Sequence, residues 1–77
     1  MEPRYVIILD FCIGALNIIR LTDGEVKESG KYDDFEEYLL TLEGKYGFKL
    51  NNCQWMTTEN LSVYWYEDGQ EVSREQF

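Results

Sequence analysis

The side chains best suited to nucleophilic or metal chemistry in this sequence are two thiols, Cys12 and Cys53. The chain contains no histidine, so neither a Ser–His nor a Cys–His catalytic arrangement is available. A zinc site would need cysteine together with carboxylates, which is an unusual donor set for structural zinc. Both cysteines fall in apolar, extended sequence, where we expect reduced, inert thiols; a single disulfide is the alternative. We therefore predict no catalytic residue, no metal and no cofactor.

Carboxylates are the second chemical group that the sequence concentrates, since Asp33, Asp34, Glu36 and Glu37 lie close together. Acid–base catalysis by paired carboxylates requires two groups with different environments in one cleft. These four residues instead open an amphipathic segment, where acidic side chains cap the first helical turn and favour the positive end of the helix dipole. We interpret them as a solvated helix start.

Aromatic residues gather towards the C-terminus, and four of them are candidate partner-binding residues: Trp55, Tyr64, Trp65 and Tyr66. Aromatic side chains on a sheet stack nucleic-acid bases in RNA-recognition domains, but those sheets are basic, whereas these residues have acidic neighbours. Tyrosine and tryptophan are also enriched at protein interfaces, because an apolar ring carries a polar tip. We predict that these four residues bind a protein.

The segment Leu9–Gly14, Leu-Asp-Phe-Cys-Ile-Gly, precedes an extended run and resembles the first phosphate hairpin of the actin and sugar-kinase ATPases. In the Asp-x-Gly pattern of that family, the glycine lets the backbone approach nucleotide phosphate, but here Cys12 stands at that position. The resemblance also implies a fold of two domains far larger than these 77 residues. We expect Asp10 to be a strand-end or turn residue, or one bonded to backbone amides.

The net charge of the chain is −8, from 15 acidic and 7 basic residues. Few lysines and arginines are available to neutralise phosphate, which disfavours binding to nucleic acid or to an anionic membrane. No apolar run approaches the roughly 20 residues of a membrane span, and no signal-peptide pattern is present, so we predict a cytoplasmic location. An acidic surface also suits a decoy that binds a basic nucleic-acid-binding protein.

The elements that must position these side chains begin with Tyr5–Phe11, a run of strand-forming residues that is apolar on both alternating faces. Such a run predicts an interior strand. Gly14 marks either a hairpin turn or a bend in one long strand, and Ala15–Thr22 is a second strand. Asp23-Gly24 predicts a type I′ hairpin turn, and Glu25–Ser29 a short polar strand at the sheet edge.

Apolar residues at helical spacing predict a helix over Asp34–Tyr46, with Asp33 beginning the cap and Gly47 ending it. Alternation then predicts strands over Cys53–Glu59 and Leu61–Glu67. Asp68-Gly69 is a second hairpin signal, and Glu71–Arg74 a short last strand.

This order predicts a single α+β domain over residues 1–77, with an antiparallel β-sheet of five to six strands and one helix packed on one face. A helix of about 12 residues cannot cover both faces of such a sheet. The uncovered apolar face can be resolved by curling, by meeting a copy of the chain, or by binding another protein.

We therefore predict a non-enzymatic interaction or regulatory module that acts through protein binding or self-association, including a homodimer. The alternatives are the acidic decoy and a small ligand-binding protein or enzyme with a pocket between helix and sheet.

Overall fold

The computed structural model describes residues 3–76, and a three-stranded antiparallel sheet forms its centre. Strand β1 (Tyr5–Asp10) lies between β2 (Ala15–Arg20) and β3 (Cys53–Thr58). The prediction of an interior first strand is confirmed. Gly14 has a φ of +66° in the turn between β1 and β2, so this glycine belongs to a hairpin rather than to a bend in one long strand.

The segment after β2 is a helix, α1 (Asp23–Ser29), so the predicted hairpin turn at Asp23-Gly24 and edge strand over Glu25–Ser29 are wrong. The Thr22 hydroxyl accepts a hydrogen bond from the Glu25 N–H at 3.1 Å, and the Glu25 carboxylate accepts one from the Thr22 N–H at 3.0 Å. This reciprocal capping box satisfies N–H groups that the start of a helix leaves free. It outweighs the preference of Asp-Gly for a hairpin turn.

The next element is the helix α2 (Phe35–Tyr46), which confirms the predicted amphipathic helix. The predicted cap at Asp33 is wrong by one residue: the N-cap is Asp34, whose carboxylate accepts a hydrogen bond from the Glu36 N–H at 3.2 Å. Gly47 ends the helix in the left-handed conformation with a φ of +76°, as a C-cap glycine commonly does. A short 3₁₀ helix, η1 (Leu50–Asn52), then leads into β3.

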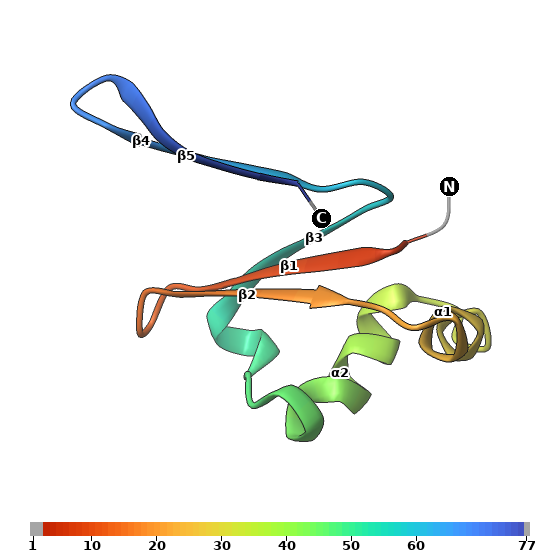
Figure 1. The fold of residues 1–77 in the computed structure, drawn as a ribbon. Helices are drawn as coiled ribbons and strands as arrows, with labels where there is room; N and C mark the ends of the chain where they lie inside the picture. Colours follow the sequence, from red (N-terminus) through yellow and green to blue (C-terminus); the bar gives the residue numbers. More distant parts are fainter. Residues whose placement is uncertain (1–2, 77) are drawn as a thin grey trace.

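Both helices lie on the same side of the three-stranded sheet (Figure 1). Strand β1 contributes Val6 and Ile8 to the core beneath them, and both side chains are fully buried. α2 contributes Leu39, which is also fully buried, and Tyr38. Covering this face is the main role of the helices, because burial of such side chains is the dominant favourable term in folding. Neither helix within residues 3–76 is long and apolar enough to cross a lipid bilayer.

The last two strands leave the sheet and pair with each other as a separate ribbon, β4 (Ser62–Glu67) and β5 (Gln70–Gln76). Their turn has Asp68 and Gly69 at φ of +52° and +77°, which confirms the second hairpin signal. A single sheet of five to six strands with one helix is therefore not what forms. The architecture is still α+β and antiparallel, with sheets of three and two strands and two α-helices.

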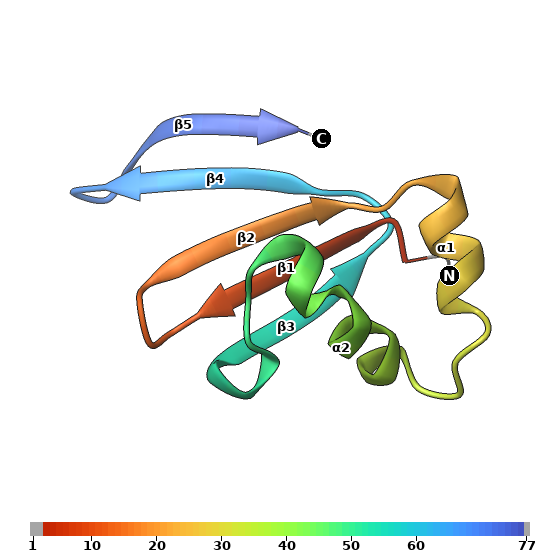
Figure 2. The same cartoon turned by 90° about the horizontal axis from the view of Figure 1, so that it is seen from below.

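The ribbon rises on the side of the sheet opposite the helices and diverges from it towards the hairpin tip (Figure 1). The view turned by 90° shows the ribbon displaced sideways, beyond β2 (Figure 2). Alternating strand patterns carry no information about which sheet a strand will join, because that choice depends on the path of the connection. Here the chain turns after Thr58, whose hydroxyl donates a 2.7 Å hydrogen bond to the carbonyl of Asn60.

Candidate functional site

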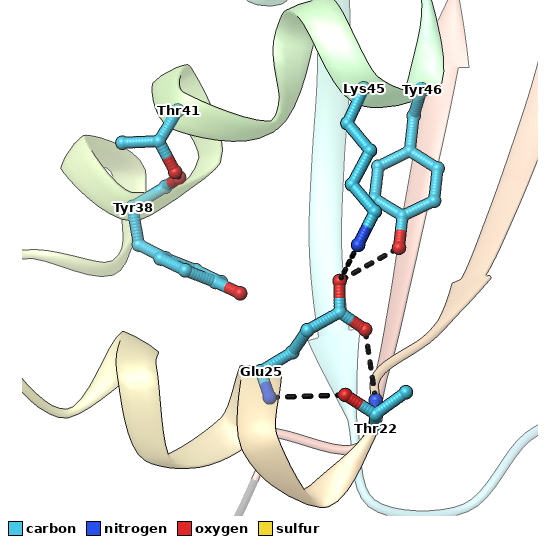
Figure 3. Close-up of polar contacts among 6 residues, drawn as sticks. All are labelled: Thr22, Glu25, Tyr38, Thr41, Lys45 and Tyr46. Atoms are coloured by element: carbon cyan, nitrogen blue, oxygen red, sulfur yellow. Dashed lines mark hydrogen bonds and ion pairs between the residues drawn. The ribbon is translucent and has the colours of Figure 1, made fainter.

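The densest polar cluster joins the two α-helices and is centred on Glu25 (Figure 3). One carboxylate oxygen accepts hydrogen bonds from the Tyr46 hydroxyl at 2.7 Å and from the Lys45 ammonium at 3.1 Å. The other oxygen accepts the capping bond from the Thr22 N–H. Only 13% of the Glu25 side chain is exposed.

These contacts set the protonation state of Glu25. Burial alone raises the pKa of this carboxyl, but the hydrogen bonds from Thr22, Tyr46 and Lys45 outweigh it and lower the pKa from 4.5 to about 2. Burial and the neighbouring carboxylate also raise the pKa of Tyr46. A carboxylate this acidic and fully hydrogen-bonded is a poor general base, so the cluster links α1 to α2 rather than offering a catalytic centre.

The two thiols lie in different environments and are both free. Cys12 is exposed in the turn after β1, whereas Cys53 is buried at the start of β3. Burial, and then the nearby Asp10 carboxylate, raise the pKa of Cys53, which opposes the reactive thiolate form. Asp10 ends β1 and accepts a 3.1 Å hydrogen bond from the Cys12 N–H, as expected of a strand-end residue bonded to backbone.

The acidic residues before α2 are exposed, and Asp34 serves as the N-cap. This agrees with their interpretation as a solvated helix start. Within the described part of the chain, no three side chains of Asp, Glu, Cys or His gather as a metal site would require.

Several large apolar side chains also remain open to solvent. One set of them lies on the sheet face opposite the helices, here called the outer face. Directly paired residues of an antiparallel sheet share a face. Ile7 is paired with Ile18 and Met56, and Leu9 with Leu16 and Gln54. Because the alternate residues Val6 and Ile8 point into the core, these paired residues form the outer face.

The outer face is hollowed into an open groove of about 310 Å³. Two side chains that line it, Leu16 and Met56, are 56% and 57% exposed. All the lining residues are uncharged, and only Gln54 among them has a polar side-chain amide; they are Ile7, Leu9, Leu16, Gln54, Trp55 and Met56. An open apolar groove of this kind is suited to another apolar surface rather than to a charged ligand.

The second exposed set is on the β4–β5 ribbon, where Trp65 is 58% and Tyr66 is 62% exposed. The indole N–H of Trp65 donates a 3.1 Å hydrogen bond to the Glu67 carboxylate. Tyr64 and Tyr66 alternate with Trp65 and so face the other side of the ribbon, where the Arg74 guanidinium lies 5.1 Å from the Tyr64 ring centre. The structure thus places three of the four predicted partner-binding residues on one ribbon, with Trp65 on one side of it and Tyr64 and Tyr66 on the other.

The fourth predicted residue, Trp55, lies elsewhere. Its side chain is half-buried against the core, with its ring centre 5.8 Å from that of Phe35 in α2. It belongs to β3, and although the residue also borders the groove, its ring packs on the helix-covered side, away from the ribbon aromatics.

Sequence reasoning identified a surplus apolar face but missed the residues that form it, above all Leu9, Leu16 and Met56. The signal was present in part, since Leu9 alternates with Ile8 and Leu16 with Ala15. Alternation divides a strand into two faces without saying which one the helices will cover, so the choice required the pairing register.

Comparisons of the chain with models of protein families, with curated proteins and with solved structures found no match.

Proposed function

We propose that this protein is a non-enzymatic interaction module that binds protein through the outer face of its three-stranded sheet and the aromatic side chains of its ribbon. The observation that carries the proposal is the position of the exposed apolar residues. Leu9, Leu16 and Met56 line one open surface, and Tyr64, Trp65 and Tyr66 stand on the ribbon that leaves the same side of the sheet and lies beyond β2 (Figure 2). Large apolar side chains that gather on an exposed surface favour an interaction site.

Two alternatives have weaker support. An acidic decoy would present its carboxylates as one surface, whereas Glu25 and Asp34 are engaged in helix capping. A ligand-binding pocket between helix and sheet would occupy the space where Ile8 and Leu39 pack with no exposure. The open groove lies on the other side of the sheet.

Photo-crosslinking in the cells that produce the protein tests the proposal. A photoreactive amino acid placed at Leu16 should crosslink to protein upon irradiation. The matched control is Leu40, an exposed leucine of α2 with 49% exposure, where the same probe should give a much weaker product. Equal crosslinking at the two positions, or none at Leu16, would contradict a binding surface on the outer face.

A further inference from the structure

We propose that the partner is a second copy of this chain, and that the β4–β5 ribbon of each copy lies across the outer face of the other copy's sheet. The inference rests on the proposed function and names its partner. The contact that defines it places Trp65 of one copy against Leu16 and Met56 of the other. In this arrangement both contacts form between the same two copies, each supplying one ribbon and one groove, so the pair is a closed, two-fold symmetric dimer.

The chain exposes more surface than a compact monomer of its mass, and the excess is close to the area that each partner buries in a dimer. A monomer of 9.2 kDa is expected to expose about 4,900 Å². This chain exposes 5634 Å², which is an excess of about 700 Å² over that expectation. A standard protein–protein interface buries about 800 Å² from each partner, so one dimer interface, comprising both ribbon-in-groove contacts, accounts for the surplus.

The extended shape of the chain indicates that the excess exposed surface belongs to the ribbon and the sheet face beside it. Its radius of gyration is 13.8 Å, against about 11.5 Å expected for a compact domain of this length. Its longest dimension is 44 Å and its shortest 17 Å. The extension comes from the ribbon, which pairs with no other strand among residues 3–76 and diverges from the sheet (Figure 1). An isolated two-stranded hairpin is marginally stable in water, so contact with the outer face of a second copy would stabilise the ribbon.

The two surfaces are chemically matched. The groove lining is uncharged and apolar apart from Gln54. Trp65 stands on the ribbon face opposite Arg74 and Tyr64, and its indole N–H is already bonded to Glu67. Burying the ring therefore leaves no donor unsatisfied. None of the groove's lining residues is ionisable, so the groove itself offers no carboxylate to a cationic partner.

Sedimentation of the purified full chain, across a range of concentrations, provides the first test. We expect a concentration-dependent species of twice the 9.2 kDa chain mass. Leu16→Glu and Met56→Glu should each weaken the dimer at least ~30-fold, because each would bury an unpaired carboxylate. Leu40→Glu adds the same charge outside the interface and should leave association unchanged. Circular dichroism establishes that each variant is folded, and two independent groove variants protect the test against the misfolding of one.

A mixing experiment tests the reciprocal geometry. Leu16→Glu damages the groove and Trp65→Glu damages the ribbon, so each variant alone should be monomeric. In a mixture, the intact ribbon of the first can meet the intact groove of the second, which restores one of the two contacts. Differently labelled variants should therefore show energy transfer when mixed and none when alone. Absence of transfer in the mixture, with the unmodified chain dimeric, would overturn the ribbon-in-groove arrangement.

Salt dependence separates this inference from the wider proposal. Two copies that each carry −8 repel one another, so raising NaCl from about 50 to about 500 mM should strengthen the dimer by screening. A monomer at all concentrations would overturn the second-copy inference. If the crosslink at Leu16 then contains a different protein, the interaction module stands without the dimer. If no crosslink forms either, both proposals fail.

Discussion

The hydroxyl of Tyr46 donates a 2.7 Å hydrogen bond to the carboxylate of Glu25, joining the last turn of α2 to the first turn of α1. α1 has only seven residues, and helices of this length are unstable in isolation. The capping box at Thr22, the link to Tyr46 and the packing of Val26 against the core therefore hold α1 in place.

Removing the charge of Glu25 should lower stability without unfolding the chain. Glu25→Gln retains an oxygen that can accept the capping bond from Thr22, but it loses the charged partner of Lys45 and Tyr46. Near neutral pH we expect a loss of about 1–2 kcal/mol in the free energy of unfolding, measured by urea denaturation. Glu36→Gln, at an exposed first-turn glutamate of α2, is the charge-matched control and should change stability by less than about 0.5 kcal/mol.

Acid should reveal the same interaction. The pKa of Glu25 is lowered from 4.5 to about 2 in the folded chain, so the folded state binds this proton less tightly than the unfolded state. The stabilisation is complete above pH 4.5 and is lost as the pH falls towards 2. Glu25 should contribute about 1–3 kcal/mol of acid destabilisation in that window. The free energy of unfolding should be measured against pH for both chains. If Glu25→Gln and the unmodified chain lose stability equally between pH 4.5 and 2, the lowered pKa of Glu25 is contradicted.

Two isoleucines test the position of the core. Ile8 is fully buried beneath the helices, whereas Ile13 is 75% exposed in the turn after β1. Ile8→Ala should lower the free energy of unfolding by about 2–5 kcal/mol, because it leaves a cavity. Ile13→Ala should change it by less than about 0.5 kcal/mol. Thermal denaturation of the two variants measures the difference. Equal losses of stability would contradict the burial of Ile8 beneath the helices.

Two glycines near the end of α2 should respond in opposite directions to alanine. Gly47 has a φ of +76°, so Gly47→Ala should destabilise the chain by about 1 kcal/mol. Gly44 lies within the helix, and an added methyl group there would meet no atom within 4 Å. Gly44→Ala should stabilise by about 0.5–1 kcal/mol through helix propensity. Chemical denaturation measures the change in the free energy of unfolding of each variant. A Gly47→Ala variant more stable than the unmodified chain would contradict the left-handed cap.

Thiol labelling should distinguish the two cysteines. Cys12 is exposed, whereas Cys53 is buried and its thiol donates a 3.1 Å hydrogen bond to the Lys49 carbonyl. A thiol reagent should modify Cys12 quickly in the native chain and Cys53 only when the chain opens. Mass spectrometry of Cys12→Ser should then show slow labelling. Rapid modification of Cys53 in that variant would contradict its place in the core.

Local patterns were sufficient for much of the fold. Alternation along Tyr5–Phe11 predicted an interior strand, the apolar spacing around Leu39 predicted α2, and Asp68-Gly69 predicted the ribbon turn. These features depend on residues that are close in sequence. The segment Glu25–Ser29 was wrongly predicted as a strand, although the sequence nearby carried a helix signal: Thr22 and Glu25 have the spacing of a capping box. The hairpin signal of Asp23-Gly24 concealed it.

The tertiary structure alone decided which apolar face is covered and which strands share a sheet. Leu16 and Met56 are far apart in sequence, and they line one groove only because β2 and β3 flank β1 in a particular register. The separation of Trp55 from Tyr64, Trp65 and Tyr66 likewise follows from the chain leaving the sheet after β3. Strand alternation is a property of neighbouring residues, whereas pairing is a choice among distant segments, made by whichever arrangement buries the most apolar surface.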